Sequence, residues 1–144
     1  MVADELFLDA SYAIALAASS DQLHSRALEL ADEIERQSRR LVTTRAVLLE
    51  IGNALSKQRY RDAAVDLLSS LESDPTVEIV PMTSDLYAQA FDLFRERPDK
   101  EWGLTDCASF VVIQIRGLIE ALTSDEHFEQ AGIRALLRKA EPIQ

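Results

Sequence analysis

Short apolar runs alternate with longer amphipathic patterns along the whole chain, and no other feature limits the possible folds as strongly. Strand-like runs are expected at 6–9, 40–44, 77–81 and 118–125, with a short fifth run at 133–137. Helical patterns are expected at 11–19, 21–38, 45–55, 61–73, 84–97 and 105–117. This alternation predicts right-handed βαβ units, and therefore an α/β fold with a mainly parallel sheet of four to five strands. In such folds ligands bind at the carboxyl ends of the strands.

The length and composition indicate an ordinary globular chain. Its 144 residues contain no internal repeat and no long linker, so we expect one domain spanning 1–144. The N-terminus, "MVADELFLDA", carries acids where a signal peptide would be positive, and no uncharged run reaches the roughly 20 residues of a membrane helix. We therefore expect a cytoplasmic protein without a membrane partner. The single cysteine, Cys107, excludes an intramolecular disulfide and a cysteine-based zinc site.

The charge is distributed unevenly. A net charge of −10 argues against a nucleic-acid partner, but residues 36–61 alone carry +6 and the rest of the chain −16. Such a basic segment is either a solvated helical face or a surface for phosphates or an acidic partner. On the second interpretation, Arg39, Arg40 and Arg45 are candidate substrate-binding residues.

Glu50 occupies an unusual place in the helical pattern "RAVLLEIGNAL". It lies three residues after Val47 and four before Ala54, so the spacing places it toward the apolar face. A lone carboxylate there is costly unless a cation meets it. That cation is either an arginine, such as Arg45, or a bound metal ion.

Three aspartates are expected near the same edge of the sheet as Glu50. Asp9 closes the first strand, Asp125 follows the fourth, and Asp106 opens a helix that starts from a neighbouring loop. Each aspartate alone is also an ordinary helix cap or first-turn residue. Together with Glu50 they form an oxygen-only ligand set that suits Mg²⁺ or Mn²⁺. Such a metal could link the acidic site to a phosphodiester and activate a water molecule.

Four segments resemble the PIN domain in its VapC-like toxin branch: "LFLDASYAIAL", "TTRAVLLEIGNAL", "WGLTDCASFVVI" and "IEALTSDEHFEQAGI". The resemblance covers nearly the whole chain and keeps the acids in the family's order. It implies a three-layer α/β/α fold and a metal-dependent endoribonuclease that cuts single-stranded RNA. Asp9, Glu50, Asp106 and Asp125 match the family's metal-binding, catalytic acids, and Asp125 is either a direct ligand or an orienting residue. Thr105 and Ser124 are weaker supporting candidates.

The resemblance also implies two protein partners. Family members usually form homodimers, and the toxins are silenced by a small antitoxin whose tail enters the active site. Two other functions stay open: a catalytically silent PIN-like module that binds RNA or protein, and another acid-rich α/β fold such as a receiver or an aspartyl-phosphate phosphatase. The receiver and the phosphatase fit poorly, because Asp9 is followed directly by Ala10, Ser11 and Tyr12, with no second acid among them. Trp102, Tyr12, Cys107 and His127 are expected to have structural roles.

Overall fold

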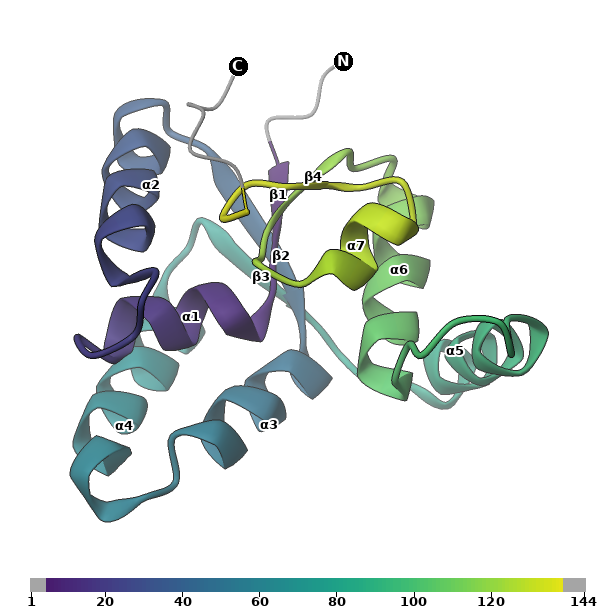
Figure 1. Ribbon diagram of the computed structural model, residues 1–144, viewed down its shortest axis with the longest axis horizontal. Helices are drawn as coiled ribbons and strands as arrows, with labels where there is room; N and C mark the ends of the chain where they lie inside the picture. The colour runs from purple at the N-terminus through teal and green to yellow at the C-terminus, as the bar shows by residue number, and fades with distance from the viewer. Residues whose placement is uncertain (1–4, 139–144) are drawn as a thin grey trace.

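The computed structural model describes residues 5–138, and these form a parallel sheet flanked by helices (Figure 1). The strands are β1 (Glu5–Leu8), β2 (Arg40–Thr44), β3 (Val77–Val80), β4 (Glu120–Leu122) and β5 (Arg134–Ala135). They are ordered β3-β2-β1-β4-β5, and all neighbouring pairs run parallel. The predicted α/β fold with a mainly parallel sheet of four to five strands is therefore confirmed.

Helices gather on two sides of this sheet, which gives the three-layer arrangement expected (Figure 1). On one side lie α1 (Ala10–Ala17), α2 (His24–Arg36), α3 (Arg45–Ala54) and α4 (Gln58–Ser73). On the other lie α5 (Ser84–Glu96), α6 (Leu104–Arg116) and α7 (Glu126–Gln130). Helix α7 was not predicted, and the strand predicted over 118–125 is confined to Glu120–Leu122. Within residues 5–138, none of the helices is long and apolar enough to cross a membrane.

The order of the strands fixes where a site can form. Strands β2 and β3 continue from one side of β1, whereas β4 and β5 lie on its other side, so the strand order reverses at β1. A crevice at the carboxyl ends of β1 and β4 follows from such a reversal. The backbone N–H of Asp9 donates to the carbonyl of Leu122 at 3.2 Å, which ties the ends of these two strands together.

A row of aromatic rings packs α7 against the sheet. Phe128 of α7 lies 6.2 Å from Phe7 of β1 and 5.0 Å from Phe110 of α6, measured between ring centroids. Phe110 in turn contacts Trp102 edge-on at 4.9 Å. Such pairs contribute about 0.5–1.5 kcal/mol each beyond their buried area. The short helix is therefore held firmly, and Trp102, like Cys107, is buried in the core as predicted.

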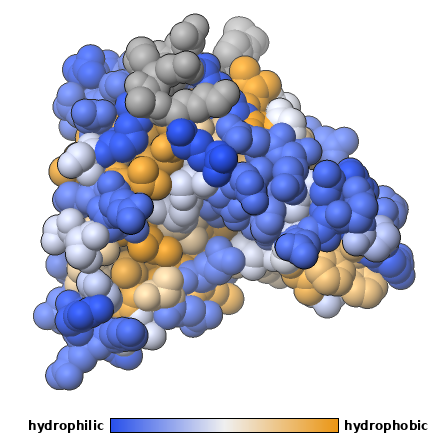
Figure 2. Space-filling model, in the orientation of Figure 1, coloured by the Kyte–Doolittle hydropathy of each residue, from blue (hydrophilic) through white to orange (hydrophobic). Residues whose placement is uncertain are grey.

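Helix α5 exposes an aromatic face. Tyr87, Phe91 and Phe94 recur at helical spacing and remain 51%, 40% and 43% exposed. Their rings stack in sequence, with centroids 6.3 and 6.5 Å apart. In Figure 2 the corresponding part of the surface, at the lower right, shows hydrophobic colour among hydrophilic neighbours. An apolar face of this kind commonly marks a contact surface.

Candidate functional site

Asp9 is a buried carboxylate held by two hydroxyl groups. It occupies the residue before α1 in an extended conformation, and its side chain does not cap that helix. Instead, Thr123 Oγ1 donates to Asp9 Oδ2 at 2.7 Å, and Ser11 Oγ donates to the same oxygen at 3.0 Å. Burial raises the pKa of Asp9 above its usual range, and the two hydroxyl bonds only partly oppose that effect.

The same two hydroxyls fix the loop that follows β4. Ser11 Oγ accepts from the backbone N–H of Ser124 at 3.0 Å, and Thr123 Oγ1 accepts from that of Asp125 at 3.0 Å. Each hydroxyl has one hydrogen, so accepting from the backbone leaves that hydrogen for Asp9. Neither Ser11 nor Thr123 was singled out from the sequence, because a lone hydroxyl two residues from an aspartate carries no distinctive pattern.

Asp106 and Asp125 meet His127 at the start of α7. Asp106 lies in the first turn of α6 and accepts from the Gly103 N–H at 3.1 Å, while Asp125 precedes α7 and accepts from the His127 N–H at 2.9 Å. His127 Nδ1 lies 3.3 Å from Asp106 Oδ2 and 3.4 Å from Asp125 Oδ1. One ligand atom from each of the three residues falls within 4.8 Å of the others, so the group is able to hold a metal ion.

Glu50 differs from its expected placement. The buried residues of α3 are Val47, Leu48 and Ile51, whereas the side chain of Glu50 is exposed, so the predicted placement of Glu50 toward the apolar face is wrong. Its carboxyl group is nevertheless partly shielded from water. This shielding, together with the negative charges of Asp9, Asp106 and Asp125, raises the pKa of Glu50 to about 7. Glu50 is therefore electrostatically coupled to all three aspartates.

The salt bridge between Glu50 and Arg45, one of the two alternatives left open by the sequence, does not form. Arg45 pairs with Glu72 of α4 instead, and no side chain in residues 5–138 forms an ion pair with Glu50. The repulsion between Glu50 and the three aspartates is thus not relieved by an ion pair between Glu50 and an arginine. Carboxylate oxygens of this kind are the ligands that Mg²⁺ and Mn²⁺ prefer, so the residues present fit such an ion.

The three candidate arginines fall at opposite edges of the sheet. Arg40 begins β2 and is paired in register with Glu5, four residues before Asp9, which corresponds to about 13 Å along the strand. Arg39 precedes it and pairs with the buried Glu120 at 3.5 Å. Only Arg45, directly after β2, lies at the carboxyl edge with the aspartates.

The supporting candidates Ser124 and Thr105 form hydrogen bonds through their backbone groups. Ser124 donates its N–H to Ser11 Oγ, and its carbonyl accepts from Arg138 at 3.3 Å. The carbonyl of Thr105 accepts from Ser109 Oγ at 3.0 Å, within α6. A role for their hydroxyl groups stays a prediction.

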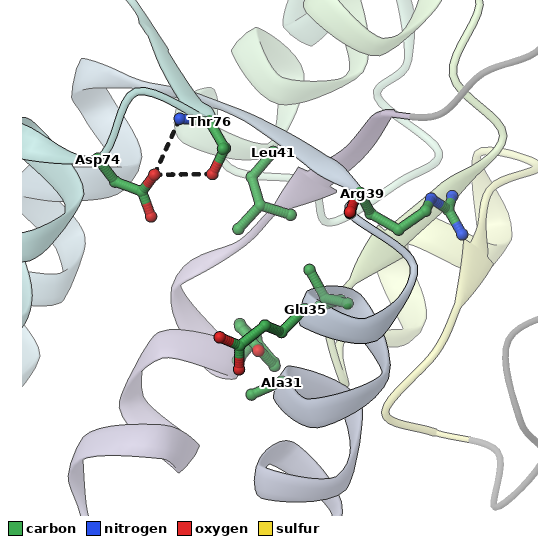
Figure 3. Close-up of a pocket in the computed structure, with 9 residues that line it drawn as sticks. Ala31, Glu35, Arg39, Leu41, Asp74 and Thr76 are labelled. Carbon is green, nitrogen blue, oxygen red and sulfur yellow. Dashed lines mark hydrogen bonds between the residues drawn. The ribbon is translucent and has the colours of Figure 1, made fainter.

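A groove of about 470 Å³ lies away from the acids, beside the end of α2 and the start of β2 (Figure 3). In it Asp74 accepts hydrogen bonds from both the N–H and the hydroxyl of Thr76, and the guanidinium of Arg39 points away from these residues. The lining includes none of the four candidate acids. The carboxylate cluster and this groove are therefore separate surfaces.

Sequence and structure comparisons identify the class to which this arrangement belongs. The family model of the PIN domain matches residues 6–133, and the chain belongs to that family. It is 27% identical over 127 residues to the 23S rRNA-specific endonuclease VapC20 from two strains of Mycobacterium tuberculosis, covering 88% of this chain and 94% of the relative.

The fold agrees with the same relative. The crystal structure of VapC20, described as a sarcin–ricin loop cleaving toxin, matches with a TM-score of 0.79 and 26% identity, over 89% of this chain and 95% of that one. The chain is thus a PIN-domain protein with distant similarity to the VapC20 toxin, and the resemblance to the PIN-domain family inferred from its motifs is confirmed.

Proposed function

We propose that the chain is a metal-dependent endoribonuclease that hydrolyses RNA phosphodiester bonds, and that it is the toxin of a type II toxin–antitoxin pair. The observation that carries the proposal is the gathering of ligand atoms of Asp106, Asp125 and His127 within 4.8 Å of one another, near enough to Glu50 for the carboxylates to raise its pKa. The match to a ribosomal-RNA endonuclease supports RNA as the substrate.

The four acids would hold one or two Mg²⁺ or Mn²⁺ ions. When bound, such an ion supplies Lewis-acid chemistry, in that it polarises a phosphodiester and makes a water molecule more acidic. The protein's own groups prepare the site. The hydroxyls of Ser11 and Thr123 fix the orientation of Asp9, and the Gly103 N–H fixes that of Asp106.

Of the three candidate arginines, Arg45 is the one placed to bind substrate at the carboxyl edge of the sheet. Its guanidinium lies at the carboxyl edge and is half exposed, so it is available to the phosphate backbone at the cost of its surface ion pair with Glu72. Thr105 and Ser124 adjoin Asp106 and Asp125 in the chain, and we retain them as candidates for orienting substrate or water.

Two partners complete the proposal. A small antitoxin would silence the enzyme in the cytoplasm, as the toxin class implies. A second copy of the chain would bury the aromatic face of α5 formed by Tyr87, Phe91 and Phe94, whose exposure supports a homodimer. The alternative function is a catalytically silent module that binds RNA or protein, and the presence of all four acids argues against it.

The experiment that tests the proposal is RNA cleavage by the wild type, Asp9→Asn and Asp62→Asn, each with Mg²⁺, Mn²⁺ or EDTA. The substrates are unstructured RNA and stem-loops, including the sarcin–ricin loop. We expect metal-dependent cleavage that falls by at least about 100-fold in Asp9→Asn, because a metal ligand is lost. Asp62 lies exposed on α4, so its substitution should change nothing.

Cleavage that persists in EDTA, or equal rates for Asp9→Asn and the wild type, would contradict the proposal. RNA binding without cleavage under any metal would favour the silent module.

A further inference from the structure

His127 brings a nitrogen donor into a cluster of oxygen donors. Its Nδ1 lies between Asp106 Oδ2, at 3.3 Å, and Asp125 Oδ1, at 3.4 Å. Its side chain is 25% exposed, and the two aspartate side chains are 16% and 34% exposed. The exposure of the imidazole therefore lies between those of the two carboxylates, and the ring is part of the same half-buried cluster.

The fold fixes the backbone that carries this ring. The Asp125 carboxylate caps α7 through the His127 N–H, and the next residue, Phe128, is fully buried between Phe7 and Phe110. Both contacts hold the backbone of His127, and neither uses its imidazole. The backbone at His127 is thus set by contacts other than those of the imidazole, which faces Asp106 and Asp125.

A nitrogen ligand changes which metal a site prefers. Mg²⁺ binds oxygen ligands almost exclusively and keeps several water molecules, whereas an imidazole suits first-row transition metals. Four carboxylates alone would accept Mg²⁺ and Mn²⁺ alike. One imidazole among them favours Mn²⁺.

We propose that His127 ligates the metal through Nδ1, together with Asp106 and Asp125, and that this nitrogen makes the site select Mn²⁺ over Mg²⁺. The proposal rests on the proposed function, which assigns a divalent metal to these acids. In the contrasting arrangement, Nδ1–H donates to Asp106 and only orients that carboxylate. Orientation alone would strengthen the binding of both metals equally.

The chain provides a matched control. His24 is its only other histidine, and its Nδ1 lies 2.7 Å from the carbonyl oxygen of Ala15, on a different element from the acids. Substituting either histidine by asparagine removes one imidazole. Only the loss of His127 should affect the metal site.

The test uses Mn²⁺ alone as the probe, on the full chain without RNA. Pulsed electron paramagnetic resonance should detect ¹⁴N coupling to bound Mn²⁺ in the wild type and in His24→Asn, but not in His127→Asn. In His127→Asn the affinity for Mn²⁺ should fall by about 10- to 100-fold, and that for Mg²⁺, measured by competition, by much less. Circular dichroism verifies that both variants are folded.

Three results would overturn the assignment: no ¹⁴N coupling in the wild type, an equal fall in both affinities for His127→Asn, or no binding of Mn²⁺ at all. RNA cleavage separates this inference from the nuclease itself. Cleavage without ¹⁴N coupling would remove His127 as a ligand and leave the nuclease standing. Coupling without cleavage of any RNA would support the ligand and remove the nuclease.

Discussion

At the scale of single residues, the site depends on hydroxyl groups as much as on acids. Thr123 is fully buried, donates to Asp9 and accepts from the N–H of Asp125. It thus connects the end of β1 with the loop that carries two further site residues, Asp125 and His127. An isosteric residue without the hydroxyl would leave Asp9 with Ser11 as its one remaining hydroxyl donor and would leave the half-buried N–H of Asp125 without its acceptor.

Thr123→Val should lower the free energy of unfolding by about 1–3 kcal/mol, because Asp9 loses one of its two hydroxyl donors and the N–H of Asp125 loses its acceptor. It should also weaken Mn²⁺ binding by about 10- to 100-fold, since Asp9 loses its orientation. Urea unfolding and metal titration measure the two effects. Thr83→Val is the control: Thr83 caps α5 through its hydroxyl, so stability should fall by about 1 kcal/mol with metal affinity unchanged. Unchanged affinity in Thr123→Val would rule out the positioning role.

The pKa of Glu50 predicts how stability changes with pH in the absence of metal. Its folded-state pKa of about 7 exceeds the ordinary value of 4.5, so the folded protein holds this proton more tightly than the unfolded chain does. The stability contributed by protonated Glu50 is therefore fully present below about pH 4.5 and is lost as the pH rises through about 7. Glu50→Gln lacks this titration.

In EDTA, Glu50→Gln should consequently be as stable as the wild type at pH 4.5 and more stable at pH 8, in urea unfolding at each pH. With saturating Mn²⁺ the order should reverse at pH 8, because the wild type gains more binding energy from the metal. A wild type that is the more stable in EDTA at pH 8 would show that the four acids do not repel one another.

At the scale of helices and strands, the sequence predicted all five strands and the longer helices but missed the short helix α7. Strands β1 to β3 and the helices that follow them carry clear apolar patterns, and the strand order explains why their ends meet. Helix α7 has five residues, too few for a helical period to be visible. Because this helix was not foreseen, His127 was assigned a structural role although its ring lies against Asp106.

The clustering of basic residues at 36–61 did not reveal where each arginine lies in the fold. Arg39 belongs to the basic 36–61 segment, but its ion-pair partner, Glu120, is 81 residues away on β4. No local pattern indicates such a pair. The placement of Arg40 at the amino edge likewise depends on the register of β1 and β2, which only the sheet defines.

The edges of the sheet yield a prediction for RNA binding. Arg45→Gln, at the carboxyl edge, should weaken binding to single-stranded RNA and reduce the slope of log affinity against log salt by about 1. Arg40→Gln, at the amino edge, should leave both unchanged. Fluorescence anisotropy at several salt concentrations, with Asp9→Asn as the background to prevent cleavage, measures this. Equal effects of the two substitutions would mean that the basic segment acts as a diffuse charge and not through Arg45.

At the scale of the whole molecule, the aromatic face of α5 predicts the assembly. Phe91 stacks between Tyr87 and Phe94, so Phe91→Lys should place a charge in the middle of the dimer contact. We expect light scattering to show a dimer for the wild type and a monomer for the variant. Leu49→Lys, at a residue 65% exposed on α3, should remain dimeric. A monomeric wild type would contradict the proposed dimer. That residues 1–144 fold as one domain stays a prediction.

The most direct test of the central claim, that acids from four segments form one metal site, is the position of a bound ion. Crystals grown with Mn²⁺ should show an anomalous scattering peak about 2.1 Å from carboxylate oxygens of Asp9, Asp106 and Asp125, with Glu50 close by, directly or through water. A peak elsewhere, or no peak at saturating Mn²⁺, would contradict the account.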